Sequence, residues 1–580
     1  MSKVFEYMKP YIGYVICIAI LLFVEACCAL ILPKFMADIV NEGVLSGNIP
    51  FIRRTGIIML LITILNVFVA VIVGYLIAKT ATGIANDLRQ SMFNKVINFS
   101  NAEINKFTTS SLITRTTNDI TQIQNTLMMA IRQFIYAPIL GVGGIVLALN
   151  RNVSMTWIIA LSTVVMVLVM VILFIVALPK FKIIQSLIDK LNLVSRENLS
   201  GILVVRAFNT QKFENKRFDK ANKDLAETNL FVDQTFALVS PIINLILNLT
   251  TVLVVWIGVK QASAFKVDIG DIFAFLQYGI LIIFAFLMVA SMLVFLPRAV
   301  VSAERVRDVL NKEESIKFAK VPLLFSEDFK GSVEFRNVSF RYPDASILDD
   351  NVLNDLNFTA KHGEITAIIG STGSGKTTIL KLLLRFFDVT QGVISIDGVD
   401  LRDVSKKDLH SKIAYVSQKA LLFTGTIHSN LLYADKNADD NRVREAVKIA
   451  QVEPIINEKS EGYDSNVAQG GVNFSGGQKQ RLSIARALVK NAQIYLFDDS
   501  FSALDLKTDA LLRAELKKQM SKKTIIIVAQ RISTIMDADH IIVLNDGNIV
   551  GLGKHSDLLK TCEVYKEIAN SQLTEEELLL

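Results

Sequence analysis

Residues 365–378 read ITAIIGSTGSGKTT, and this stretch decides the fold of the second half of the chain. The largely apolar run 365–369 is typical of a short buried strand, and it stops at Gly370. From Gly370 to Thr377 the sequence matches G-x-x-x-x-G-K-[ST], a pattern that joins a strand to a helix in phosphate-binding proteins. The stretch therefore predicts a strand, a glycine-rich loop and a helix.

The residue types in this loop suit a chain of phosphates. Glycines let the backbone turn so that successive N–H groups point inward at phosphate oxygens, and the helix adds the positive end of its dipole. Lys376 is expected to bridge the β and γ phosphates, and the Thr377 hydroxyl to bind Mg²⁺. A glycine-rich turn that fits the pattern by chance is the alternative, and the motifs further along argue against it.

Composition places part of the chain in a membrane. Of the 580 residues, 51% are hydrophobic and 20% charged, and the mean hydropathy is +0.42. Nearly all the long apolar runs lie before Pro297. The net charge of +6 comes without a basic stripe with interleaved aromatics, so no nucleic-acid partner is expected. Cys17, Cys27, Cys28 and Cys562 suggest neither a disulfide framework nor a metal site.

Six apolar stretches are long enough to cross a bilayer, which needs roughly 20 helical residues. They are approximately residues 11–32, 56–78, 130–149, 155–178, 236–259 and 271–296. The first stretch is long and lacks an obvious small-residue cleavage site, so we expect a retained span and not a signal peptide. Pro138 and Pro241 lie within spans, where proline commonly kinks a helix.

The connections between the stretches predict their orientation. Those after the first, third and fifth are short, whereas the other two are long, polar and poor in helix breakers. The fourth-to-fifth connection carries Lys180, Lys182, Lys190, Arg196, Arg206, Lys212, Lys216 and Arg217. By the positive-inside rule the long connections, both termini and the second half of the chain are expected in the cytoplasm. Arg53 and Arg54, in a short outer loop, run against the rule.

Glu25 stands inside the first apolar stretch. A carboxylate there is costly unless it faces a bundle interior, a partner or a water-filled cavity, which makes Glu25 a candidate residue for transport. A protonated Glu25 hydrogen-bonded to a neighbouring helix is the alternative.

Short strands, turns and helices alternate from about Gly331, as in an α/β domain. Tyr342 follows the strand-like VEFRNVSF, where it could stack on adenine or simply pack at a strand edge. The strand IAYVSQ ends at Gln418, which is placed to reach Mg²⁺ and an attacking water.

Two further motifs follow. Residues 473–478, NFSGGQ, open a helix whose N–H groups and Ser475 hydroxyl form a second anion site. Residues 494–498, IYLFD, form a buried strand that ends at Asp498, which is expected to hold Mg²⁺ through water.

Together these residues resemble the ATP-binding cassette (ABC) family over the whole chain. GSTGSGKT corresponds to the Walker A loop, LFD to Walker B, NFSGGQ to the signature and SALD, residues 502–505, to the D-loop. Six spans ahead of one cassette are similar to a half-transporter of the exporter type. The stretches LITRTTNDI, residues 112–120, and ENLSGILVVRAF, residues 197–208, resemble its intracellular loops.

The resemblance implies a membrane α-helical six-span domain with the type I ABC exporter fold, residues 1–310. A linker, 311–330, and a cytoplasmic α/β P-loop nucleotide-binding domain, 331–580, are implied to follow. ATP and Mg²⁺ are the implied cofactors; membrane lipid, a small amphipathic substrate and a second half-transporter are the implied partners. In this family two cassettes meet head to tail, with each ATP between the Walker motifs of one chain and the signature of the other.

The residues that the resemblance assigns to nucleotide binding are Tyr342, Gly370, Ser371, Thr372, Gly373, Ser374, Gly375, Lys376, Thr377, Thr378, Gln418, Asp498, Ser475, Gly476, Gly477 and Gln478. Thr377, Gln418 and Asp498 are the residues expected to hold Mg²⁺.

Three positions depart from the family pattern. Asp499 stands where the family has a catalytic glutamate, so its carboxylate is one methylene further from the attacking water. Gln530 replaces a histidine that contacts the γ phosphate, and it cannot carry that charge. Gln469 replaces a glutamate before the signature, a change expected to affect coupling more than chemistry. The pattern resembles the degenerate, slowly hydrolysing site of heterodimeric exporters.

The sequence therefore predicts one subunit of a heterodimeric, ATP-driven exporter of amphipathic or hydrophobic compounds, drugs or lipids, in a bacterial plasma membrane. Its own Walker site is expected to hydrolyse slowly, while its signature completes the competent site of the partner. A nucleotide-gated channel or regulatory subunit is the alternative from another class, and a continuous file of polar pore residues would indicate it. The remaining alternative is a homodimer, such as a lipid flippase, in which Asp499 and Gln530 merely slow hydrolysis.

Overall fold

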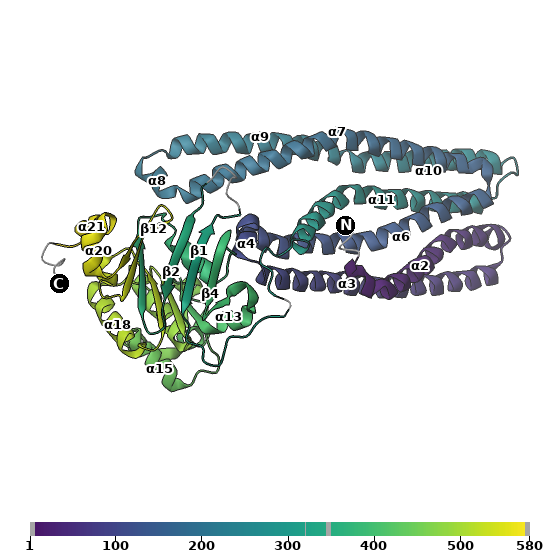
Figure 1. The fold of residues 1–580 in the computed structure, drawn as a ribbon. Coiled ribbons are helices and arrows are strands. Elements are labelled where there is room, and N and C mark those ends of the chain that lie inside the picture. Colours follow the sequence, from purple (N-terminus) through teal and green to yellow (C-terminus); the bar gives the residue numbers. More distant parts are fainter. Residues whose placement is uncertain (1–5, 320, 344–349, 575–580) are drawn as a thin grey trace. The chain divides into compact units, whose positions relative to one another are not determined.

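The computed structural model describes residues 6–319, 321–343 and 350–574, and the chain divides into two compact units (Figure 1). Met1–Ile97 and Ser110–Lys312 form the first unit, and Asn98–Thr109 and Glu313–Leu580 form the second. Separate hydrophobic clusters fill the interior of each unit.

The first unit is built from long helices. Their bounds are α2 Ile12–Asp38, α3 Ile49–Ile97, α5 Thr109–Thr114, α6 Ile120–Arg151, α7 Val153–Ser200, α8 Ile202–Ala207, α9 Gln211–Ala237, α10 Val239–Ala262 and α11 Ile269–Leu310, with a 3₁₀ turn at Lys9–Tyr11 and π-helical segments at Ile39–Val44 and Arg115–Asp119. Within the described residues, six helical segments are long and apolar enough to cross a membrane, as the sequence predicts. The chain is therefore a multi-pass membrane protein.

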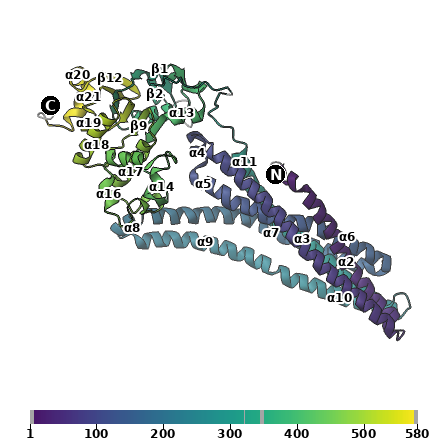
Figure 2. The same ribbon diagram turned by 90° about the horizontal axis from the view of Figure 1, so that it is seen from below.

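Several helices continue far beyond the apolar stretches. α3 runs on to Ile97 and α7 to Ser200, because the long connections hold few helix breakers. Figure 2 shows α7 and α9 side by side along much of their length. Pro138 lies inside α6 without ending it, whereas Pro241 lies in the first turn of α10, where its missing N–H costs little. The break between α9 and α10 at Leu238 falls just before this proline.

One charged cluster joins three helices of the first unit at one end. Arg151, the last residue of α6, donates to Asp38 at the end of α2 (2.9 Å) and to Asp271 near the start of α11 (3.0 Å). Below it, Phe275 and Tyr278 are buried in the core, and the Tyr278 hydroxyl donates to the Leu30 carbonyl at 3.3 Å. No motif in the sequence indicates these ion pairs.

The second unit is an α/β structure with two main sheets. Its strands are β1 Val333–Phe340, β2 Leu353–Ala360, β3 Ile365–Gly370, β4 Gln391–Ile396, β5 Val399–Asp400, β6 Ile413–Val416, β7 Gly425–Thr426, β8 Asn466–Val467, β9 Ile494–Asp498, β10 Thr524–Val528, β11 His540–Asn545 and β12 Asn548–Gly553. Its α-helices are α4 Asn101–Phe107, α12 Lys376–Leu383, α13 Lys406–Lys412, α14 Ile427–Leu431, α15 Asp440–Ile449, α16 Glu453–Asn457, α17 Gly476–Val489, α18 Leu506–Gln519, α19 Ile532–Ile535, α20 His555–Thr561 and α21 Glu563–Asn570.

The larger sheet has the order β12-β11-β3-β10-β9-β6. All its strands are parallel except β12, which forms an antiparallel hairpin with β11. The smaller sheet, β2-β1-β4-β5, is antiparallel. Because neighbouring parallel strands end on the same edge, the loops that follow β3, β6, β9 and β10 gather there, which is where α/β sheets usually bind ligands.

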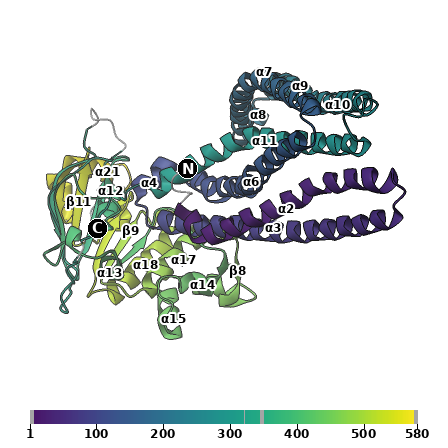
Figure 3. The same ribbon diagram turned by 90° about the vertical axis from the view of Figure 1, so that its right-hand side faces the viewer.

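The side chains of β3 point alternately into two layers of the core of the second unit. Ala367 and Ile369 pack among residues of α14, α15, α17 and α18, which Figure 3 shows gathered in one region of this unit. Ile368 points to the opposite layer, together with α12 and the smaller sheet. The strand is therefore buried on both faces, which explains its continuous apolar run.

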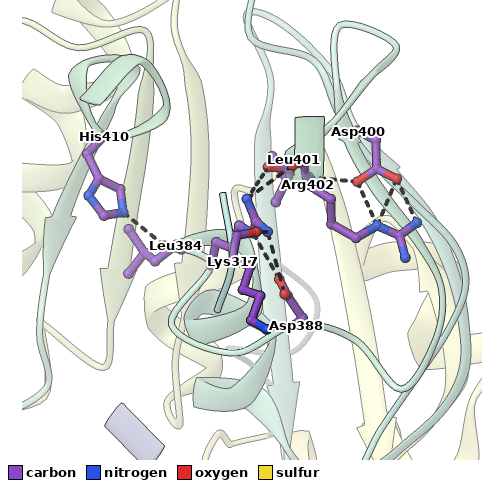
Figure 4. A network of polar contacts seen from close by, with 8 residues as sticks. Lys317, Leu384, Asp388, Asp400, Leu401, Arg402 and His410 are labelled. Atoms are coloured by element: carbon purple, nitrogen blue, oxygen red, sulfur yellow. Dashed lines mark hydrogen bonds and ion pairs between the residues drawn. The ribbon is translucent and has the colours of Figure 1, made fainter. Parts of the chain in front are cut away.

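A buried arginine ties the segment before β1 to the second unit (Figure 4). Arg385 is 5% exposed, and it donates to the carbonyls of Lys317 (3.0 Å) and Leu401 (3.1 Å) and to the Asp388 carboxylate (2.9 Å). Each contact satisfies a different part of the planar guanidinium, as a buried arginine requires.

Candidate nucleotide site

The glycine-rich loop lies between β3 and α12, as the sequence predicts. Gly375, the residue before α12, has a φ of 97°, a left-handed conformation that side chains rarely adopt. A Cβ on Gly370 would approach the Leu544 carbonyl oxygen to 2.1 Å, so this position has no room for any other residue. Among the described residues no side chain caps the start of α12. The N–H groups of Thr378 and Ile379 bond to the Gly375 carbonyl, which leaves those of Lys376 and Thr377 for another acceptor.

Lys376 folds back over this loop. Its Nζ donates to the carbonyls of Gly370 (2.9 Å) and Ser371 (2.7 Å). Burial lowers the pKa of the Lys376 ammonium, and the nearby charges of Asp499 and Asp498 act in the opposite direction. Within the loop, Thr372 and Gly373 are exposed, whereas Ser374 is buried and its hydroxyl makes no hydrogen bond to described residues.

Asp498 ends β9 on the same edge of the sheet and is 1% exposed. Its carboxylate accepts hydrogen bonds from the Thr377 hydroxyl at 2.8 Å and the Tyr415 hydroxyl at 3.2 Å. Burial raises the pKa of Asp498, and the two hydrogen bonds partly offset that effect. Two of the three residues predicted to hold Mg²⁺, Thr377 and Asp498, are therefore in direct contact.

Gln418, the third predicted Mg²⁺ residue, contacts a different carboxylate. Its Nε2 donates to Asp499 Oδ2 at 3.1 Å. Asp499 has a φ of 48°, and its N–H donates to the Val528 carbonyl at the end of β10. Asp499 and Gln530 line one small pocket together with Ser502 and Arg531. The structure therefore brings the two altered catalytic positions together.

Tyr342 lies beside the start of α12. Its hydroxyl is 2.9 Å from Oγ1 of Thr378, and its ring stands edge-on to Phe340 and Phe387, with centroids 4.9 and 5.1 Å away. The Lys381 ammonium lies 6.0 Å from the ring centroid. The ring is thus fixed against the helix that begins at the phosphate loop.

The signature residues form a separate structure at the start of α17. Ser475 accepts from the Gln478 N–H at 3.3 Å, and Gln478 Oε1 accepts from the Ser475 N–H at 2.9 Å, a reciprocal capping box. Gly476 is exposed, and a Cβ on Gly477 would lie 3.0 Å from the Ala503 carbonyl of the SALD segment. Among the described residues, no hydrogen bond joins residues 475–478 to the glycine-rich loop. Gln469 is exposed in a 3₁₀ turn before the signature.

Glu25, the candidate in the first unit, is buried with 3% exposure. Its Oε1 accepts from Arg132 of α6 at 2.8 Å, so its partner on the neighbouring helix is a cation.

Sequence reasoning missed three residues with clear contacts. Tyr415 lies within the quoted strand IAYVSQ, but no motif marks its bond to Asp498. Gln572, just after α21, donates to the Gln530 carbonyl at 2.9 Å and accepts from the Ile532 N–H at 2.8 Å. Arg132 is the only basic residue within the third apolar stretch, residues 130–149. This isolated charge is the signal that could have marked Arg132 as a candidate.

Comparisons with known proteins cover both halves of the chain. Residues 15–286 match the ABC transporter transmembrane region, and residues 353–502 match the ABC transporter family. The chain superposes on a bacterial Atm1-family ABC exporter with a TM-score of 0.78 and 24% identity, covering 98% of this chain and 99% of the other. It therefore has the type I exporter fold that the sequence predicts.

Curated relatives match over nearly their whole length. An uncharacterised ABC transporter ATP-binding protein of Mycobacterium tuberculosis is 39% identical over 570 residues, 98% of this chain and 97% of the relative. The ABC transporter ATP-binding protein YfiB of Bacillus subtilis is 34% identical over 576 residues, 99% of each chain. A putative export ATP-binding/permease protein of Rickettsia prowazekii is 31% identical, with 98% of each chain covered. With its membrane region and its ATP-binding domain on one polypeptide, this chain belongs to the ABC transporter family.

Proposed function

We propose that this chain is one subunit of a heterodimeric, ATP-driven exporter of amphipathic or hydrophobic compounds, drugs or lipids, in a bacterial plasma membrane. The nucleotide unit and both termini lie in the cytoplasm in this proposal, on the side of the basic connections. The export direction is supported by the Rickettsia relative, a putative export ATP-binding/permease protein, and by the fold shared with an exporter.

Mg²⁺-ATP is the proposed ligand of the glycine-rich loop, and the residues present fit it. The uncapped N–H groups of α12 and the Lys376 ammonium are donors for phosphate oxygens, and the Tyr342 ring offers a face for adenine. Thr377 and Asp498 already lie 2.8 Å apart, and both supply the oxygen ligands that Mg²⁺ prefers. In the described residues no cluster of three or more His, Cys, Asp or Glu residues could hold a metal, so phosphate oxygens and water must complete the shell.

Two features support a requirement for a second chain. The signature residues form their own capping box and, within the part of the chain that the structure describes, make no hydrogen bond to the glycine-rich loop, so they are available to another nucleotide. Helix α8 contains no buried residue, and Leu203 and Phe208 are 77% and 76% exposed. Such an apolar tip on a cytoplasmic extension needs a partner surface.

The main observation in favour of slow hydrolysis at this chain's own site is that Asp499 and Gln530 line the same pocket. A general base must reach the attacking water, and a shift of about 1 Å can cost on the order of a hundredfold in rate. The Asp499 carboxylate is shorter than the usual glutamate, and it is held toward Gln418 by a hydrogen bond. Gln530 offers no positive charge to the transition state.

The test is asymmetric mutation of an assembled pair. The chain alone in lipid nanodiscs should show almost no ATP hydrolysis, whereas the complex with its six-span cassette partner should turn over briskly. In that complex Ser475→Arg in this chain should abolish turnover, because it blocks the partner's site, while Lys376→Ala in this chain should leave a substantial fraction. Brisk hydrolysis by this chain alone, or equal loss from the two variants, overturns the heterodimer proposal.

A further inference from the structure

The ion pair of Glu25 and Arg132 lies deep in the first unit. Glu25 is near the middle of α2, and its side chain is 4% exposed. Arg132 lies 19 residues before Arg151, about 28 Å along α6 from the charged cluster at the helix end. Charged residues at such depth are rare, and they usually face a bundle interior or a water-filled path.

Only part of the Arg132 guanidinium is used by Glu25. One terminal nitrogen, Nη2, donates to Glu25, and Nε is buried without a partner. The side chain nevertheless remains 39% exposed, and in the described part of the chain its other terminal nitrogen has no hydrogen-bond acceptor. A guanidinium that is partly exposed at this depth cannot face hydrocarbon cheaply, so its open side faces water or a bound molecule.

Arg151 provides the contrast within the same helix. Its two terminal nitrogens each donate to a carboxylate, Asp38 and Asp271, so both ends of this guanidinium are paired with protein. Arg132 has a single carboxylate partner, and donors remain for a ligand.

The surroundings of Arg132 suit the head of an amphiphile. Tyr136, one helical turn further, places its ring 5.9 Å from the guanidinium, and its hydroxyl has no partner among the described residues. Met129, 41% exposed, lies on the same side of α6 one turn earlier and offers an adaptable apolar surface. Gln133 reaches Ser291 of α11 at 3.4 Å, so three helices contribute polar groups here.

We propose that Arg132, held in position by Glu25, binds the anionic head group of the transported amphiphile, with the Tyr136 hydroxyl as a second donor. The ligand class is a carboxylate, phosphate or sulfonate attached to an apolar body. Arginine presents a planar fork that matches such groups. Glu25 acts as a positioning residue, because it fixes the guanidinium and balances its charge when no ligand is present. This inference rests on the proposed transport function and specifies its substrate class.

The test measures binding by the full chain in phosphatidylcholine nanodiscs without ATP. The probe is an undecanoic acid carrying a dansyl group, compared with its uncharged primary amide, and fluorescence titration gives the Kd of each. Arg132→Gln should weaken binding of the acid at least tenfold and leave binding of the amide unchanged. Arg132→Lys should restore part of the affinity, since it keeps the charge but not the fork.

Two further variants separate ligand binding from a merely structural ion pair. Glu25→Gln keeps a hydrogen-bond acceptor for Arg132 and removes the competing charge, so affinity for the acid should hold or rise. Arg151→Gln, the matched change at a guanidinium with two carboxylate partners, should not alter the preference for acid over amide. Phosphatidylglycerol added to the nanodiscs identifies the source: competition with the acid indicates a lipid head group, and no competition indicates a soluble anion.

Equal effects of Arg132→Gln on acid and amide, or parallel loss in Arg132→Gln and Glu25→Gln, overturn the proposal. These readouts do not depend on ATP hydrolysis, so they remain valid if the chain proves to be a homodimer. Conversely, brisk hydrolysis by the chain alone would contradict the heterodimer without touching the anion site.

Discussion

Gln418 donates a hydrogen bond to Asp499, with 3.1 Å between Nε2 and Oδ2. A residue predicted to contact Mg²⁺ and a residue at the position of the general base are thus tied to each other. Asp499 is also held by its backbone, since its N–H bonds to the Val528 carbonyl and its φ is 48°. The carboxylate therefore cannot move toward a water molecule without breaking a contact.

Restoring the two family residues should raise hydrolysis. In the assembled pair, the double variant Asp499→Glu with Gln530→His should increase turnover at this chain's site about tenfold or more, because the base reaches further and a chargeable group enters the pocket. Phosphate release should be measured with the partner's own site inactivated. Asp499→Asn is the control, and it should not raise the rate; an unchanged rate in the double variant would contradict slow chemistry at these positions.

Tyr342 should contribute to nucleotide affinity through its ring and not through its hydroxyl. Tyr342→Ala should weaken ATP binding roughly tenfold, within the range of about 1–3 kcal/mol for stacking of a base on an aromatic ring. Tyr342→Phe should bind almost as the native chain does, although it loses the contact with Thr378. Titration with a fluorescent ATP analogue distinguishes the two variants. A stronger effect of the Phe variant would indicate that the hydroxyl positions α12.

Asp498 should lower the stability of the nucleotide unit at neutral pH. Its pKa is raised in the folded chain, so the folded state holds its proton to higher pH than the unfolded state does. The free energy of unfolding therefore falls as the pH rises from the pKa of Asp498 in the unfolded chain to its pKa in the folded chain. Above both pKa values the destabilisation is complete. Asp498→Asn removes that cost and should raise the Tm of the nucleotide unit at pH 8.

The same comparison at low pH is the internal control. As the pH falls through the raised pKa of Asp498, the carboxylate takes up a proton in the native chain, and the difference in Tm between the two proteins should shrink. The variant should also lose Mg²⁺-dependent ATP binding. A difference in Tm that grows on acidification would mean that the bonds from Thr377 and Tyr415 outweigh burial.

Local patterns were sufficient for much of the fold. Six apolar stretches predicted the six membrane-crossing segments, because length and hydropathy alone set that requirement. The phosphate loop was predictable because two of its positions accept only glycine. A Cβ at Gly370 would clash with backbone, and Gly375 has a left-handed φ that side chains rarely adopt. β3 and β9 were predictable as buried strands because both are short apolar runs, as strands covered on both faces require.

Contacts between distant segments were not predictable in the same way. Tyr415 lies on β6 and Asp498 on β9, and their hydrogen bond depends on these two strands being neighbours in the sheet. The sequence of neither strand specifies that order. The partner of Glu25 lies 107 positions away on α6, so sequence could state that a partner was needed but not which one. The end of α9 at Leu238 was hidden because the apolar pattern continues across it.

Gln572 should position the segment that carries Gln530. Its side-chain amide bonds to the Gln530 carbonyl and to the Ile532 N–H, so it bridges the backbone on both sides of Arg531. Arg531 in turn reaches the Leu504 carbonyl of the SALD segment at 3.5 Å. Gln572→Ala removes both bonds and should lower stability by about 1–3 kcal/mol, given roughly 0.5–1.5 kcal/mol for each. Gln572→Glu keeps the acceptor for Ile532 and loses the donor, so its Tm should fall between those of the native chain and Gln572→Ala.

A positioning role further predicts that Gln572→Ala cancels the gain in turnover from Gln530→His while leaving ATP affinity unchanged. If the histidine variant gains the same rate with and without Gln572, the bridge is structural only.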